Sequence, residues 1–132
     1  MSSERRVSSR MTEPLQFEEV DSPPRYATST DKPVRYAAVA DRHGTVLGYV
    51  WANDDDDAAG WKVRPAGGDE AFNMGALWVS KLHDAKARGL APTAALTEMI
   101  RESDPDKPSH IVSNSVKEAE NLEIVKALAA QD

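Results

Sequence analysis

The stretch VRYAAVA-DRHG-TVLGYVWA, residues 34–52, decides the fold, because its two apolar arms flank a four-residue turn in the pattern of a β-hairpin. Asp41 and Gly44 hold the first and fourth positions of the turn. This composition predicts a type I turn followed by a one-residue bulge at a left-handed glycine. With that turn, Val39 pairs with Leu47, and the register of the whole hairpin follows.

Both faces of this hairpin are apolar, so both need a cover. Three covers are open for the second face: the last helix, the N-terminal segment, or a second copy of the chain. Aromatic residues are enriched at interface centres and twofold dimers are the commonest oligomers. We therefore carry forward a homodimer, with burial inside one chain as the alternative. The predicted interface consists of the large residues of the second face: Val39, Leu47, Tyr49 and Trp51.

The middle of the chain predicts a third strand and a long helix. Residues 61–64 alternate apolar and basic side chains, which extends the hairpin to an antiparallel meander. Asp69 suits a helix N-cap, and the helical pattern runs to Arg88, before Gly89. We expect this helix to be largely buried. Gly75 inside it costs about 1 kcal/mol relative to alanine, so we expect close approach to the sheet there.

The C-terminal third predicts two further helices. Pro92 suits the first position of a helix that ends near Ser103. Residues 109–114 predict a short strand or an extended connector. Ser115 and Glu118 have the spacing of a capping box, which predicts that the last helix begins there. The expected class is α+β: a three- to four-stranded antiparallel sheet built on the hairpin, packed by one long helix and two shorter ones.

The N-terminal part has a different composition from the rest. Residues 1–33 hold four of the eight prolines and few large apolar residues, and they predict a flexible tail or linker. Within it, residues 15–20 (LQFEEV) alternate imperfectly and offer a short edge strand to the hairpin. Residues 34–132 then form one globular domain.

Charge and composition exclude several classes of protein. The 22 acidic residues outnumber the 16 basic ones and give a formal net charge of -6, which argues against a nucleic-acid partner. The chain has no cysteine, no apolar run long enough for a membrane span, and no apolar centre of a secretory signal at its start. We expect a cytoplasmic protein, and its alanine-rich composition suggests a bacterial source.

The most conspicuous charge is the run Asp54–Asp57. Its spacing begins like a calcium loop, with Gly60 in the sixth position, but Ala66 stands where the bidentate glutamate belongs. Like charges this close repel one another and favour an exposed loop. We therefore expect a solvated acidic turn and assign no metal ligands, with weak binding of a divalent ion as the alternative.

No catalytic constellation is recognisable. The three histidines lack the spacing of a metal motif, and Ser80 beside His83 in mid-helix has no backbone donors for an oxyanion hole. An enzyme that uses Asp41, His43 or His83 is the minority hypothesis, and no cofactor is implied. Residues 39–48 resemble the aspartate-to-glycine turn of CBS domains. The elements around them follow another order, so the resemblance implies a turn and no nucleotide site.

Two hypotheses of function remain. The first is an acidic, non-enzymatic interaction or regulatory module that forms a homodimer or binds another protein through its acidic loop and hairpin. The second is a small-molecule-binding domain with an aromatic pocket between the sheet and the long helix. The predicted pocket residues are Trp61, Phe72 and Trp78.

Overall fold

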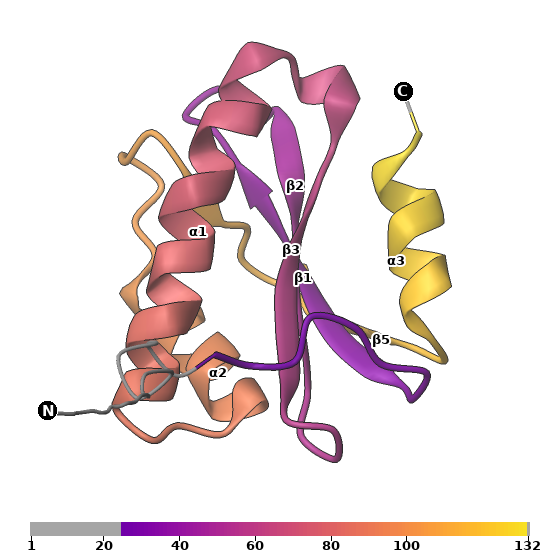
Figure 1. The fold of residues 1–132 in the computed structure, drawn as a ribbon. Helices are drawn as coiled ribbons and strands as arrows, with labels where there is room; N and C mark the ends of the chain where they lie inside the picture. Colours follow the sequence, from indigo (N-terminus) through magenta and orange to yellow (C-terminus); the bar gives the residue numbers. More distant parts are fainter. Residues whose placement is uncertain (1–24, 132) are drawn as a thin grey trace, which may run out of the picture.

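The hairpin forms the two central strands of an antiparallel sheet, and helices cover both faces of that sheet (Figure 1). The computed structural model describes residues 25–131. Helices α1 and α2 lie on one face and α3 on the other, which confirms the predicted α+β class. The elements in chain order are β1 (Val34–Ala40), β2 (Val46–Asn53), β3 (Ala58–Val63), a 3-10 turn (Pro65–Gly67), α1 (Asp69–Ala87), α2 (Pro92–Glu102), β4 (His110–Ile111), β5 (Lys117–Ala119) and α3 (Leu122–Ala129).

The turn forms as predicted, but the register of the hairpin differs from the predicted one. Gly44 has a φ of 85° and donates its N–H to the carbonyl of Asp41 at 3.1 Å. Val39 pairs with Gly48 rather than with Leu47, which is an extra residue at a β-bulge. Because side chains alternate along a strand, one extra residue exchanges the two faces of β2 relative to β1.

The sheet separates two apolar cores. Both are built from alternating residues of the same strands, as a sheet covered on both faces requires. The core under α1 and α2 includes Tyr26, Ala37, Val39, Val50, Ala52, Ala59, Trp78, Leu82, Ala85, Ala95, Leu96, Met99 and Ile111. The core under α3 includes Val34, Tyr36, Tyr49, Trp51, Ala58, Ala119, Leu122, Val125 and Ala129.

The expected close approach at Gly75 is confirmed, and Trp61 makes the contact. The Trp61 indole lies across Gly48, where an added Cβ would come within 2.5 Å of the ring. A Cβ at Gly75 would come within 2.9 Å of the indole nitrogen. The two glycines on either side of this indole therefore allow α1 to pack closely against β2 and β3.

The expectation that α1 is largely buried is wrong. Its buried residues are Ala71, Trp78, Leu82 and Ala85, which form a narrow stripe toward the sheet. Phe72, Leu77 and Val79 are 57%, 45% and 36% exposed. The physical reason is that one sheet face covers only about a third of a helix, whereas the apolar residues of α1 spread around more of it.

The predicted capping box at Ser115 is also wrong. The Ser115 hydroxyl accepts the N–H of Ala38 at 3.0 Å, and Lys117–Ala119 pair with β1 as the short strand β5. The last helix begins after Asn121, whose side chain accepts the N–H of Ile124 at 3.1 Å. Residues 115–119 thus bond the backbone of β1, which would otherwise be unpaired, instead of starting a helix.

Residues 25–33, assigned from sequence to the tail, pack on the domain. Tyr26 is 4% exposed and donates its hydroxyl to the carbonyl of Leu90 at 2.7 Å. Ala27 pairs with Ala58 at the start of β3. The edge strand predicted for residues 15–20 lies outside the described residues, as does the rest of the chain before Arg25.

Candidate functional site

The four residues predicted for a dimer interface do not share a face. Val39 lies in the core under α1 and α2, whereas Tyr49 and Trp51 lie under α3. Leu47 occupies the bulge and is fully buried. None of the four is more than 9% exposed, because α3 covers Tyr49 and Trp51, and α1 and α2 cover Val39. Within one chain they are core residues.

The three residues predicted for a ligand pocket do not surround a common cavity. Trp61 and Trp78 stack directly on each other, with ring centroids 6.5 Å apart and an interplanar angle of 10°. Phe72 is 57% exposed on α1. A cavity of about 30 Å³ beside Trp78 has room for about one water molecule. The indoles therefore fill the space between sheet and helix.

The acidic loop is tied to three other segments rather than simply solvated. Asp54 accepts the backbone N–H of Thr93 at 2.9 Å and its hydroxyl at 2.6 Å, at the start of α2. A carboxylate is favoured there because it meets the positive end of the helix dipole. Lys86 of α1 pairs with Asp57, and Asp56 binds the segment before β1. Across residues 25–131, no group of three or more acidic or histidine side chains has the arrangement to hold a metal ion.

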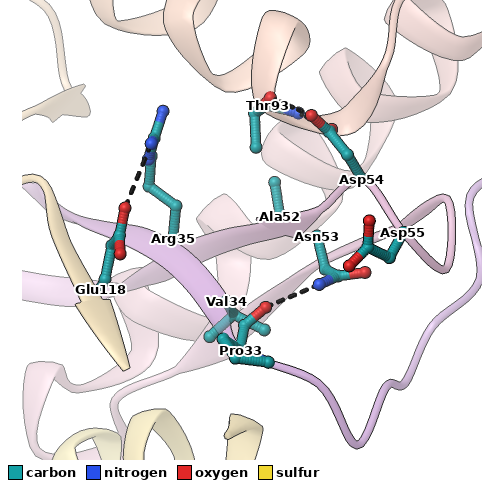
Figure 2. Close-up of a pocket in the computed structure, with 9 residues that line it drawn as sticks. All are labelled: Pro33, Val34, Arg35, Ala52, Asn53, Asp54, Asp55, Thr93 and Glu118. Carbon is teal, nitrogen blue, oxygen red and sulfur yellow. Dashed lines mark hydrogen bonds and ion pairs between the residues drawn. The ribbon is translucent and has the colours of Figure 1, made fainter. Parts of the chain in front are cut away.

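A shallow cavity of about 210 Å³ lies beside this loop, between β1, β2 and β5 (Figure 2). Most of its polar side chains already have partners. Arg35 pairs with Glu118 at 3.2 Å, and the Asn53 side chain donates to the carbonyl of Pro33 at 2.6 Å. Asp55 is the one lining carboxylate without a hydrogen-bond or ion-pair partner within the described range. This arrangement holds no pair of nucleophile and base.

The histidines lie apart from one another and from candidate nucleophiles. His43 is exposed in the hairpin turn and His83 is half-buried on α1. Nδ1 of His110 is buried and has no hydrogen-bond partner in the described part of the chain. Between residues 25 and 131, no histidine side chain is hydrogen-bonded to a serine or carboxylate. The geometry therefore offers no support for catalysis by these groups.

A different feature stands out at β3, whose outer side is largely uncovered. Ala59 donates its N–H to the carbonyl of Ala27 at 3.0 Å, away from β2, whereas Arg64 donates toward β2 at 2.9 Å. Because backbone groups alternate along a strand, Trp61 and Val63 also point their N–H and C=O away from β2. On this outer side of β3, Ala27 is the only partner that residues 25–131 provide. We call the backbone from Trp61 to Val63 the open edge.

One wall of the open edge is apolar and belongs to α1. Phe72, Gly75, Val79 and Lys86 follow one another three, four and seven residues apart, so they lie on the same side of the helix. Gly75 contacts Trp61, and Lys86 reaches the loop before β3, so this side of the helix faces β3. Phe72 and Val79, at 57% and 36% exposed, therefore stand beside the open edge.

The other wall is basic. Lys62 points to the α3 side of the sheet, where the charges of Lys126 and Glu123 act on it. Burial, and then the nearby Lys126 charge, hold the pKa of Lys62 below its ordinary value. Lys126 pairs with Glu123 at 3.1 Å, whereas Lys62 has no ion-pair partner within the described range. Arg64 follows β3 and bonds the carbonyl of Val46 at 3.1 Å.

Sequence reasoning missed this site although it found the strand. The alternation of residues 61–64 predicted a third strand, and a strand at the end of a meander has one free side. Whether a later segment covers that side depends on the fold as a whole. The later strands β4 and β5 pair with β1 instead.

Comparisons with protein-family models, with curated proteins and with solved structures found no match to this chain. Among the described residues, no helix is both long and apolar enough to cross a membrane.

Proposed function

We propose that this protein is a non-enzymatic interaction module that binds an extended segment of another protein along the open edge of β3. The observation that carries the proposal is the row of backbone groups at Trp61 and Val63 that have no partner among residues 25–131. Such a row is a template for an added strand, and peptide-recognition domains use it in this way. The exposed Phe72 and Val79 beside it supply apolar contact area.

Binding at a sheet edge fits the other properties of the molecule. Main-chain hydrogen bonds give such complexes their affinity, and side-chain contacts on either side give specificity. The open edge has both kinds of neighbour, with apolar side chains from α1 and basic ones near α3. The absence of a catalytic arrangement within residues 25–131 is compatible with this role.

To test the proposal, peptides that bind the full chain are selected from a random display library. The affinity of each selected peptide is then measured for two variants of the chain. Val63→Pro removes an outward N–H without removing a bond to β2, and Val63→Thr keeps that N–H. Selected peptides are expected to lose at least tenfold in affinity for Val63→Pro and little for Val63→Thr. Peptides that bind both variants equally, or no selected peptide at all, would contradict the proposal.

Self-association through Val39, Leu47, Tyr49 and Trp51 stays a prediction. These residues are buried under the helices of one chain, so a dimer that uses them requires α3 to leave the sheet. Light scattering over a dilution series of the full chain measures it. A dimer with α3 undocked would support the hairpin interface over the open edge.

A further inference from the structure

We propose that the partner of the open edge is a peptide segment in which acidic and apolar residues alternate; this inference rests on the proposed function and specifies its ligand. In Figure 1 the segment that contains Ala27 crosses β3 once and then continues to β1. Beyond that crossing, the part of β3 from Trp61 onward faces outward without a partner among the described residues.

The geometry of strand addition divides the partner's side chains into two rows. In a strand, successive side chains point to opposite faces, so an added strand continues both faces of the sheet. On the α1 face the neighbours are Trp61, Val63 and the exposed Phe72 and Val79, so apolar side chains fit there. On the α3 face the neighbour is Lys62, so the other row meets positive charge.

Charge around Lys62 favours an acidic row. Lys62 and Lys126 contribute two positive charges to this side, and the carboxylate of Glu123 contributes a negative one. The chain as a whole has a net charge of -6, so the patch is opposite in sign to the rest of the molecule. Opposite charges directly across two strands stabilise the pair, and like charges destabilise it. An acidic side chain opposite Lys62 is therefore the complementary choice.

The same charges argue against a second copy as the occupant. If two β3 strands paired about a twofold axis, Lys62 and Lys126 of one chain would lie near those of the other. Like charges brought together across an interface select against that pairing. A lysine on an edge strand also protects it from indiscriminate pairing. The open edge thus combines a free backbone with a charge that selects an acidic strand.

The test uses hydrogen exchange of the full chain, followed by NMR at the amides of Trp61 and Val63. Three capped peptides of equal length alternate valine with glutamate, with lysine or with serine. The glutamate peptide is expected to slow exchange at both amides and to bind about tenfold more tightly than the lysine peptide. The difference is expected to shrink as salt is added, because the charges are partly exposed.

Charge reversal sharpens the test. Lys62→Glu is expected to abolish the preference for the glutamate peptide or turn it toward the lysine peptide. Lys107→Glu is the matched control, because Lys107 is exposed in the connection between α2 and β4, away from β3. It makes the same change in net charge and is expected to leave the preference unchanged. Equal effects of the two variants would overturn the inference.

The remaining outcomes separate the inference from the proposed function. If all three peptides protect the edge amides equally, the acidic preference is wrong and the proposed function stands. If none protects them and they exchange freely, the proposed function fails as well. Slow exchange of these amides without any peptide would overturn the inference. If it does not depend on protein concentration, residues of the same chain cover the open edge. If it increases with protein concentration, a second copy covers it.

Discussion

The two sides of the central meander, the outer side of β1 and the outer side of β3, differ in how much of their backbone is paired. The outer side of β1 is paired along most of its length, with β5 at Val34–Tyr36 and β4 at Val39–Ala40. Between these two strands the Ser115 hydroxyl takes the N–H of Ala38. The outer side of β3, in the part of the molecule that is described, meets only Ala27. One stretch of the chain, residues 110–119, closes the edge at β1, whereas in residues 25–131 the edge at β3 has a single bridge.

The comparison shows that edge closure here does not follow apolar patterning. The residues of β5 are KEA, which have no strand alternation, and they replace a helix start that local sequence favours. What they satisfy is the backbone of β1, whose unpaired groups would otherwise be buried at a cost. From Gly60 to Val63 the residues of β3 are half-buried, so water can reach this part of the strand until a partner does.

The largest expected effect comes from placing proline in the centre of the sheet. Ala37 pairs with Val50 between two neighbours, so Ala37→Pro removes a ladder bond and is expected to cost about 3 kcal/mol or more of unfolding free energy. Val63→Pro removes only an outward N–H and is expected to cost less than about 1 kcal/mol. Urea unfolding measures both, and equal losses would mean that the Val63 N–H is already bonded.

A medium effect is expected at the closed edge. The Ser115 hydroxyl accepts from Ala38 at 3.0 Å and donates to the carbonyl of Val112 at 2.7 Å. Ser115→Ala leaves the Ala38 N–H without a partner and is expected to cost about 1–3 kcal/mol of unfolding free energy. Glu118→Ala removes only an exposed ion pair with Arg35, worth less than about 1 kcal/mol.

This pair of variants also separates strand from capping box. In a capping box both side chains bond the first turn of the helix, so both substitutions would cost comparable amounts. Chemical denaturation of the two variants under identical conditions gives the comparison. A loss at Glu118 that matches the loss at Ser115 would contradict the β5 strand.

The sequence predicted the elements of the fold better than their pairing. The hairpin, the third strand and the helix from Pro92 are confirmed, because turn residues and apolar spacing act locally. The bulge at Leu47 was missed because no residue type marks it, and it exchanged the faces on which the predicted interface depended. The short strand β5 was missed because only the unpaired neighbour β1 explains it.

The candidate site was harder to predict than the fold. Its parts, the strand and the exposed residues of α1, come from separate stretches of sequence. Phe72 was assigned to a pocket because its apolar character indicates burial, and only the narrow contact of α1 with the sheet leaves it outside. The positive charge near Lys62 is reinforced by Lys126, which lies 64 positions later in the chain. The packing of α3 brings the two lysines together, and the local sequence around Lys62 does not indicate this.

The smallest expected effect tests how firmly the one bridge at β3 is held. The segment after Ala27 is fastened by Asp56, which accepts the Thr30 hydroxyl at 2.6 Å and pairs with Lys32 at 2.9 Å. The hydrogen bond from Thr30, and then that from Lys32, hold the pKa of the Asp56 carboxyl below its ordinary value of 3.8. The ionised form therefore stabilises the fold, fully above that ordinary value and progressively less as the pH falls through the lowered one.

Asp56→Asn should accordingly lower the urea midpoint slightly at neutral pH, and the difference from the original chain should disappear on acidification below the lowered pKa of Asp56. Asp55→Asn is the matched control, because Asp55 has no bonded partner within residues 25–131 and its replacement should leave the midpoint unchanged. A difference at Asp56 that persists in acid would mean that the amide lacks shape or contacts that the carboxyl supplies. Packing, rather than the charge of Asp56, would then hold the segment that bridges β3 at Ala27.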